Sequence, residues 1–97
     1  IFAGNDDMAL GVMAVAQRRG VSLPRDLSVV GFDGGESADL VWPQLTTVRQ
    51  PVREMAATAA AAVIAMVEAG ERVASLQQLD FALLMRASSA PRAEVRD

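Results

Sequence analysis

Leu27-Ser28-Val29-Val30-Gly31-Phe32-Asp33 is the stretch of sequence that decides the fold. It is short, almost wholly apolar and rich in β-branched residues, which is typical of a strand buried on both faces. A second apolar segment, Ile1-Phe2-Ala3-Gly4, is followed by Asn5-Asp6-Asp7. Ligands of open α/β sheets bind at the carboxyl ends of the strands. The two segments therefore predict polar side chains at the edge of a small-molecule pocket.

Composition narrows the class of protein. The 97 residues make at most one small domain, and because the first residue lies inside an apolar segment without an initiator Met, we expect a fragment of a longer protein. The sequence has no Cys and no His, which argues against disulfides, zinc sites and most hydrolytic chemistry. We expect no metal and no cofactor. A net charge of −3 without a basic cluster argues against nucleic-acid binding by this stretch, and no segment is long and apolar enough to cross a membrane.

Helical and strand-like segments alternate along the first third of the chain. A helix is predicted near residues 7–19, with Asp6 or Asp7 as its cap and Gly20 at its end. Strands are predicted near residues 1–4 and 27–32. Strand, helix and strand form a βαβ unit, in which the two strands are parallel and their carboxyl ends share one edge.

The remaining segments continue this α/β pattern. A loop over residues 34–43 can contain a short helical turn, and a strand is predicted near 45–50. Pro51 is well placed to start a helix over residues 51–69, which carries an apolar stripe of Val52, Met55, Ala56, Ala59, Val63, Met66 and Val67. A last strand near residues 78–86 alternates Leu79, Phe81, Leu83 and Met85 onto one face, and residues 90–97 are expected to be a disordered tail.

Three blocks of sequence carry a family resemblance. Residues 5–11, 19–33 and 43–51, followed by residues 84–89, resemble the lac repressor family of bacterial transcription regulators. The resemblance implies a parallel-sheet part of a two-lobed fold similar to type I periplasmic binding proteins. Residues 1–89 would form the C-terminal portion of the effector-binding domain, with parts of both lobes. Operator DNA would bind through a separate N-terminal helix-turn-helix that has no counterpart in this chain.

Asp33 is the first candidate for contact with a ligand. A carboxylate at the end of a strand accepts hydrogen bonds from two hydroxyls, or from one hydroxyl and a ring N–H, as a sugar or a nucleobase offers. The alternative is that Asp33 caps the following turn and orders the loop at Gly34 and Gly35. The ligand-contacting aspartate of the family stands at this position, which favours the functional interpretation. The family commonly has Asp or Asn next, so Gly34 argues against a ligand contact at that neighbouring position.

Two further residues are candidate ligand contacts. Asn5 matches a family position that can contact the effector, and the alternative is a turn residue that tolerates left-handed geometry. Gln50 either lines the rim of the pocket or makes a plain hydrogen bond at the hinge between the lobes. Asp6 and Asp7 are expected to be helix caps rather than ligand contacts.

An apolar run lies in what should be a surface loop. Leu40, Val41 and Trp42 follow one another, and Leu10 and Met13 are expected on a neighbouring helix face. Such a patch favours association, whereas the alternative is that Trp42 folds back over the sheet. Members of the family resemble one another in pairing through this lobe. We therefore expect a homodimer that uses Leu10, Met13, Val41 and Trp42.

The sequence fits three classes of function to different degrees. The leading hypothesis is the effector-sensing part of a cytoplasmic DNA-binding transcription regulator of the repressor type, with a small-molecule effector such as a sugar. The alternative is a periplasmic sugar-binding protein of similar fold. An enzyme comes third, because no nucleophile and base and no metal cluster can be assembled from these residues, so no catalytic residue is predicted.

Overall fold

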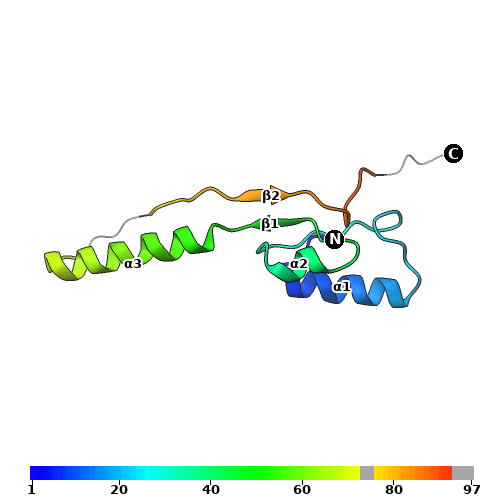
Figure 1. Ribbon diagram of the computed structural model, residues 1–97, viewed down its shortest axis with the longest axis horizontal. Coiled ribbons are helices and arrows are strands. Elements are labelled where there is room, and N and C mark those ends of the chain that lie inside the picture. Colours follow the sequence, from blue (N-terminus) through cyan, green and yellow to red (C-terminus); the bar gives the residue numbers. More distant parts are fainter. Residues whose placement is uncertain (73–75, 93–97) are drawn as a thin grey trace. The chain divides into compact units, whose positions relative to one another are not determined.

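The computed structural model describes residues 1–72 and 76–92. Its helices and strands, in chain order, are α1 (Asp6–Arg18), α2 (Glu36–Leu40), β1 (Thr47–Arg49), α3 (Val52–Ala69) and β2 (Ala82–Leu84), as Figure 1 shows. The chain forms two compact units. One contains residues 1–50 together with the chain from Ala82 onward, and the other is Pro51–Phe81. Among the described residues, no helix combines the length and the apolar character needed to cross a membrane.

The parallel arrangement predicted for the first unit is confirmed. Phe2 pairs with Val30 and Val30 with Thr46, each in parallel, and Asp33 pairs with Arg49 in the same sense. Val30 N–H donates to the Ile1 carbonyl at 2.9 Å, and Gly31 N–H donates to the Thr46 carbonyl at 2.9 Å. The segment over residues 27–33 therefore lies between the other two, with the carboxyl ends of all three at one edge.

The regular strands are shorter than the sequence predicts. Residues 1–4 and 27–32 make isolated bridges only. Val29 N–H donates to the Ser88 carbonyl at 2.9 Å, whereas two residues later Gly31 bonds to Thr46. From Val30 to Asp33 the central segment stays beside residues 46–49 in one parallel register, although the bridges at its two ends remain isolated.

β1 and β2 form a two-stranded antiparallel sheet. Thr47 lies opposite Leu84, and Arg49 lies opposite Ala82. The strand predicted over residues 78–86 is confirmed only in its middle, and the side chains of Phe81, Leu83 and Met85, predicted to share one face, are exposed. In the described chain, no element covers these side chains.

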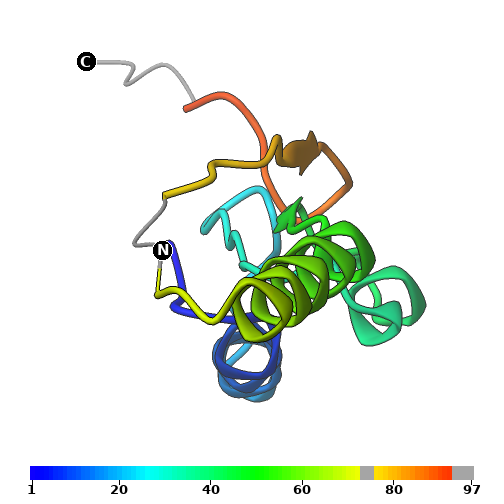
Figure 2. The same ribbon diagram turned by 90° about the vertical axis from the view of Figure 1, so that its left-hand side faces the viewer.

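The core of the first unit lies between α1 and the extended segments. Its buried residues are Ala3, Ala9, Met13, Val29, Ala38 and Leu45. α1 and α2 lie on the same side of the β1 and β2 ribbon (Figure 1, Figure 2). Met13 is 1% exposed, so the expectation that it lies on a surface for a second copy is corrected: its side chain fills the core of its own unit.

Local sequence signals predict the ends of α1 to within one residue. The helix begins one residue earlier than predicted, and its N-cap is Asn5, whose Oδ1 accepts a hydrogen bond from Met8 N–H at 2.8 Å. The expectation that Asp6 or Asp7 caps the helix is therefore wrong. Gly20, with φ of 74°, follows the end of α1 in the left-handed conformation, as predicted.

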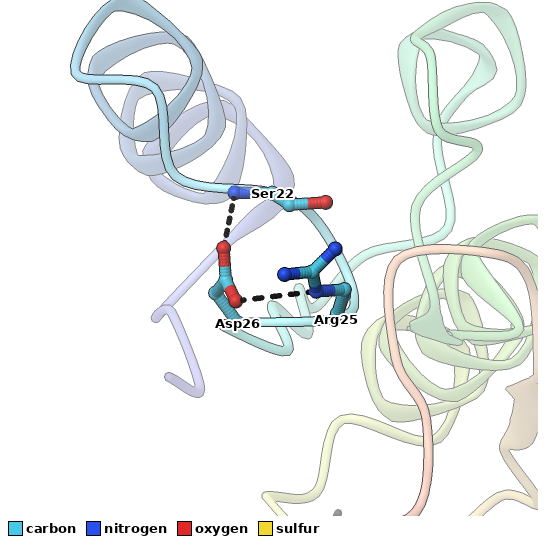
Figure 3. Close-up of polar contacts among 3 residues, drawn as sticks. All are labelled: Ser22, Arg25 and Asp26. Carbon is cyan, nitrogen blue, oxygen red and sulfur yellow. Dashed lines mark hydrogen bonds and ion pairs between the residues drawn. The ribbon is translucent and has the colours of Figure 1, made fainter.

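The loop after α1 returns the chain to the central segment (Figure 3). Asp26 Oδ2 accepts from Ser22 N–H at 2.9 Å, and Arg25 Nε lies 3.7 Å from the other oxygen of Asp26. The Arg25 side chain is 85% exposed and that of Asp26 is 48% exposed, so solvent screens the ion pair and the hydrogen bond is the contact that shapes the loop.

α3 begins at Val52, one residue later than predicted, and ends at Ala69 as predicted, followed by Gly70, which has φ of 68°. None of its residues is buried, so no other part of the described chain covers its predicted apolar stripe.

At the other end of the chain, the expectation of a disordered tail is wrong at Ala90, which exchanges two hydrogen bonds with Ser28 at 3.1 and 3.3 Å. Residues 93–97 of that predicted tail lie outside the described residues.

Candidate functional site

Asp33 and Gln50 lie together at the edge where the parallel segments end. Gln50 Nε2 donates to Asp33 Oδ1 at 2.8 Å, and Gln50 backbone N–H donates to the Asp33 carbonyl at 3.3 Å. Asp33 is exposed and Gln50 is half-buried. In the described chain the hydrogen bonds leave Asp33 Oδ2 without a partner, so the carboxylate retains acceptor capacity. Two of the three predicted ligand contacts therefore share one site.

The backbone of Asp33 is strained. Its φ is 136°, a value that non-glycine residues rarely adopt and that costs on the order of 1–3 kcal/mol. Its neighbours hold it there, since Asp33 N–H donates to the Val48 carbonyl at 2.9 Å and Asp6 N–H donates to the Phe32 carbonyl at 2.9 Å. Strain of this kind persists where the surroundings over-determine a residue, and it is concentrated at ligand sites.

The turn after Asp33 lies tightly against β1. Gly34 has φ of 76°, and a Cβ atom added to it would stand 2.7 Å from both Cα and Cβ of Arg49. No residue with a side chain fits there without moving the strand. Gly34 therefore allows the chain to turn at Asp33 while β1 stays in place.

Asn5 also lies near this edge of the unit, at the start of α1. It is half-buried, and its Oδ1 is occupied by the capping bond to Met8. The alternative of a left-handed turn residue is wrong, because Asn5 is extended, with φ of −156°, and caps α1. Its side-chain NH₂ is the group that remains for a ligand.

Asp6 is the residue of this site that sequence reasoning missed. It is 3% exposed, and its carboxylate accepts from Gly34 N–H at 3.1 Å, from Gly35 N–H at 3.0 Å and from Thr47 Oγ1 at 2.6 Å. One signal could have pointed to it. A glycine inside an otherwise β-branched strand, here Gly31, often marks a close approach by another group.

The residues predicted for a dimer interface differ in how far the structure exposes them. Trp42 is 79% exposed, which contradicts the alternative that it folds back over the sheet, and its carbonyl accepts from Gln17 Nε2 at 2.9 Å. Leu10 and Val41 are half-buried against the core. With Met13 fully in the core, the exposed part of the predicted patch consists of Trp42 and the neighbouring Leu40, which is 83% exposed.

The chemistry available at this edge is hydrogen bonding. Across residues 1–72 and 76–92, no group of three His, Cys, Asp or Glu side chains stands close enough to hold a metal ion. A depression of about 380 Å³ lies elsewhere, at the C-terminal end of α1, where Val15, Arg18 and Arg19 line it. Asp33 and Gln50 offer a carboxylate and an amide, which suit a ligand with several hydroxyl groups.

Comparison with known proteins gives matches in both sequence and structure. The family model of the periplasmic binding protein-like domain matches residues 1–89. Catabolite control protein A of Priestia megaterium is 49% identical over 59 residues, which cover 61% of this chain and 18% of that protein. The HTH-type transcriptional repressor PurR of Vibrio cholerae is 47% identical over 55 residues, 57% of this chain and 16% of that protein.

A solved structure extends the similarity to nearly the whole chain. The LacI family transcriptional regulator from Enterococcus faecium, with bound ribose, superposes with a TM-score of 0.86 at 30% identity, over 95% of this chain and 34% of its own. This chain therefore spans about a third of that structure, and less than a fifth of the two curated relatives. The matched family domain, the sequence relatives and the superposed structure agree: the chain belongs to the periplasmic binding protein-like domain family, as a member of the lac repressor family of transcription regulators.

Proposed function

We propose that this chain is the effector-sensing part of a DNA-binding transcription regulator and that Asp33 and Gln50 bind its effector. The observation that carries the proposal is the 2.8 Å hydrogen bond that joins their side chains at the edge where the parallel segments end. The effector is a sugar or a related metabolite rich in hydroxyl groups. The ribose in the related Enterococcus faecium regulator supports this class of ligand.

The geometry suits a polyhydroxylated ligand. Gln50 occupies one oxygen of the Asp33 carboxylate and orients it, while the second oxygen accepts from a ligand hydroxyl. Hydrogen bonds to a charged acceptor are stronger than neutral ones, and each contributes about 1.5–3 kcal/mol. The side-chain NH₂ of Asn5 is the third proposed contact.

The proposal extends to the complete regulator. Residues 1–89 form the C-terminal portion of an effector-binding domain with parts of both lobes, and the division of the chain after Gln50 supports this organisation. The regulator acts as a homodimer in the cytoplasm and binds operator DNA through an N-terminal helix-turn-helix. The curated relatives are transcription regulators, which favours this function over a periplasmic sugar-binding protein and over an enzyme.

Asp33→Asn tests the proposal, because it keeps the shape of the side chain and removes its charge. In the complete regulator, effector affinity should fall by about 1.5–3 kcal/mol, which is roughly tenfold to more than a hundredfold. Operator affinity without effector should change little. Calorimetric titration with a panel of sugars that begins with ribose measures the first quantity, and fluorescence anisotropy with operator DNA measures the second.

Asp7→Asn is the matched control. It removes the same charge from an exposed position in the first turn of α1, where the described chain shows no hydrogen bond to the carboxylate. Effector affinity should stay at the wild-type value in this variant. If Asp33→Asn lowers the melting temperature and leaves effector affinity unaltered, Asp33 is a turn cap and the proposal is wrong.

A further inference from the structure

The carboxylate of Asp6 connects three segments that are distant in the sequence. Asp6 starts α1, Gly34 and Gly35 belong to the turn after Asp33, and Thr47 starts β1. Oδ2 of Asp6 accepts from the two glycine N–H groups at 3.1 and 3.0 Å, and Oδ1 accepts from the Thr47 hydroxyl at 2.6 Å. A carboxylate accepts all three hydrogen bonds with its two oxygens, whereas an amide has one acceptor oxygen and would have to reverse the direction of the bond to the Thr47 hydroxyl.

Asp6 holds the peptide groups on both sides of Asp33. Its backbone N–H donates to the Phe32 carbonyl at 2.9 Å, just before Asp33, and its side chain accepts from Gly34 N–H, just after. Asp33 lies between these two anchors with φ of 136°. Together with the backbone hydrogen bonds of Asp33 to Val48 and Gln50, these two contacts of Asp6 hold the strained conformation from outside the turn.

The central segment leaves room for this carboxylate. A Cβ atom on Gly31 would overlap Asp6 Oδ1 and would stand 2.9 Å from Cδ2 of Leu45. Gly31 itself has an ordinary backbone conformation, so close approach rather than backbone freedom requires a glycine there.

We propose that Asp6 is a positioning residue of the effector site: its three hydrogen bonds hold the turn over residues 33–35 so that the Asp33 carboxylate meets Gln50. The proposal rests on the proposed function for the identity of the site. Asp6 touches no ligand in this scheme, since it is buried beneath the turn. It acts through the position of Asp33.

The test compares variants of the complete regulator by nuclear magnetic resonance with isotope-labelled glycine and glutamine. In Asp6→Asn, the amides of Gly34 and Gly35 should exchange with solvent at least about tenfold faster, because they lose a charged acceptor. The side-chain amide signal of Gln50 should move toward its position in Asp33→Ala, where the partner of that amide is absent. No ligand is needed for either measurement.

Ser88→Ala is the control for a merely structural effect. Ser88 is buried, and its hydroxyl donates to the Val29 carbonyl at 2.6 Å and accepts from Thr46 N–H at 2.8 Å, away from the turn. This variant should lower the melting temperature and leave the Gln50, Gly34 and Gly35 signals at their wild-type positions.

Thr47→Val keeps the test decisive if Asp6→Asn does not fold. It preserves the charge of Asp6 and removes one of its three donors, so the Gln50 signal should move in the same direction by a smaller amount. Unmoved Gln50 and glycine signals in the variants that fold would overturn the positioning role. If Asp33→Asn leaves sugar affinity unaltered, the proposed function fails. The nuclear magnetic resonance signals of Gln50, Gly34 and Gly35 still decide in that case whether Asp6 positions Asp33.

Discussion

At the scale of single residues, two glycines share a backbone conformation and differ in their surroundings. Gly20 has φ of 74° with no atom within 4 Å of an added Cβ, whereas Gly34 has φ of 76° with Arg49 Cα at 2.7 Å. Gly20→Ala should reduce the free energy of unfolding by about 1–2 kcal/mol through backbone strain alone. Gly34→Ala should lose about 1–3 kcal/mol more, because β1 must move. Urea denaturation measures both, and equal losses would show that the turn shifts freely away from β1.

At the scale of elements, α1 depends on Asn5, the residue that caps its N-terminus. Asn5→Ala should lower the free energy of unfolding by about 0.5–2 kcal/mol because the Met8 N–H loses its acceptor. Asn5→Ser restores the cap, so its stability should stay close to wild type while its effector affinity falls by about 0.5–1.5 kcal/mol, since the side-chain NH₂ is gone. Thermal melting and sugar titration separate the two effects. Wild-type affinity in Asn5→Ser would leave Asn5 as a cap only.

α3 shows how far local signals alone can define an element. Alanine favours the helix intrinsically, and Gly70 in the left-handed conformation ends it, so its bounds need no tertiary partner. Its apolar side chains at Val52, Val63 and Val67 stay exposed in the described chain. The apolar pattern predicted the helix and its apolar face, but a pattern of this kind does not specify what packs on that face.

At the scale of the whole molecule, the exposed patch at Leu40 and Trp42 tests the proposed dimer. Trp42→Asp should weaken dimerisation by about 1–4 kcal/mol, because it places an unpaired charge in a desolvated contact, and should leave the melting temperature of the dissociated protomer nearly unchanged. Val41→Asp is the comparison, since Val41 packs against the core and its substitution should lower stability as well. Sedimentation of the complete regulator measures the dissociation constant. An unchanged constant in Trp42→Asp would remove Trp42 from the interface.

The sequence by itself determined the order of the elements, the bounds of α1 and α3 to within one residue, the parallel pairing of the first two segments and the family. These features follow from signals within a few residues of each other, such as caps, glycine stops and apolar runs, and from motifs read in order. The sequence also predicted in part that Asp33 and Gln50 lie together, because parallel strands bring their carboxyl ends to one edge.

Only the tertiary structure decided the role of Asp6, the burial of Met13 and the short length of the regular strands. Asp6 is 28 residues from Gly34 and 41 residues from Thr47, and an acid at the start of a helix fits a cap equally well from local evidence. Which atoms meet across such separations depends on the packing of whole segments. The same periodic pattern that places Met13 on an apolar helix face does not say whether its own core or a second chain covers that face, because burial is a property of the neighbours and not of the residue.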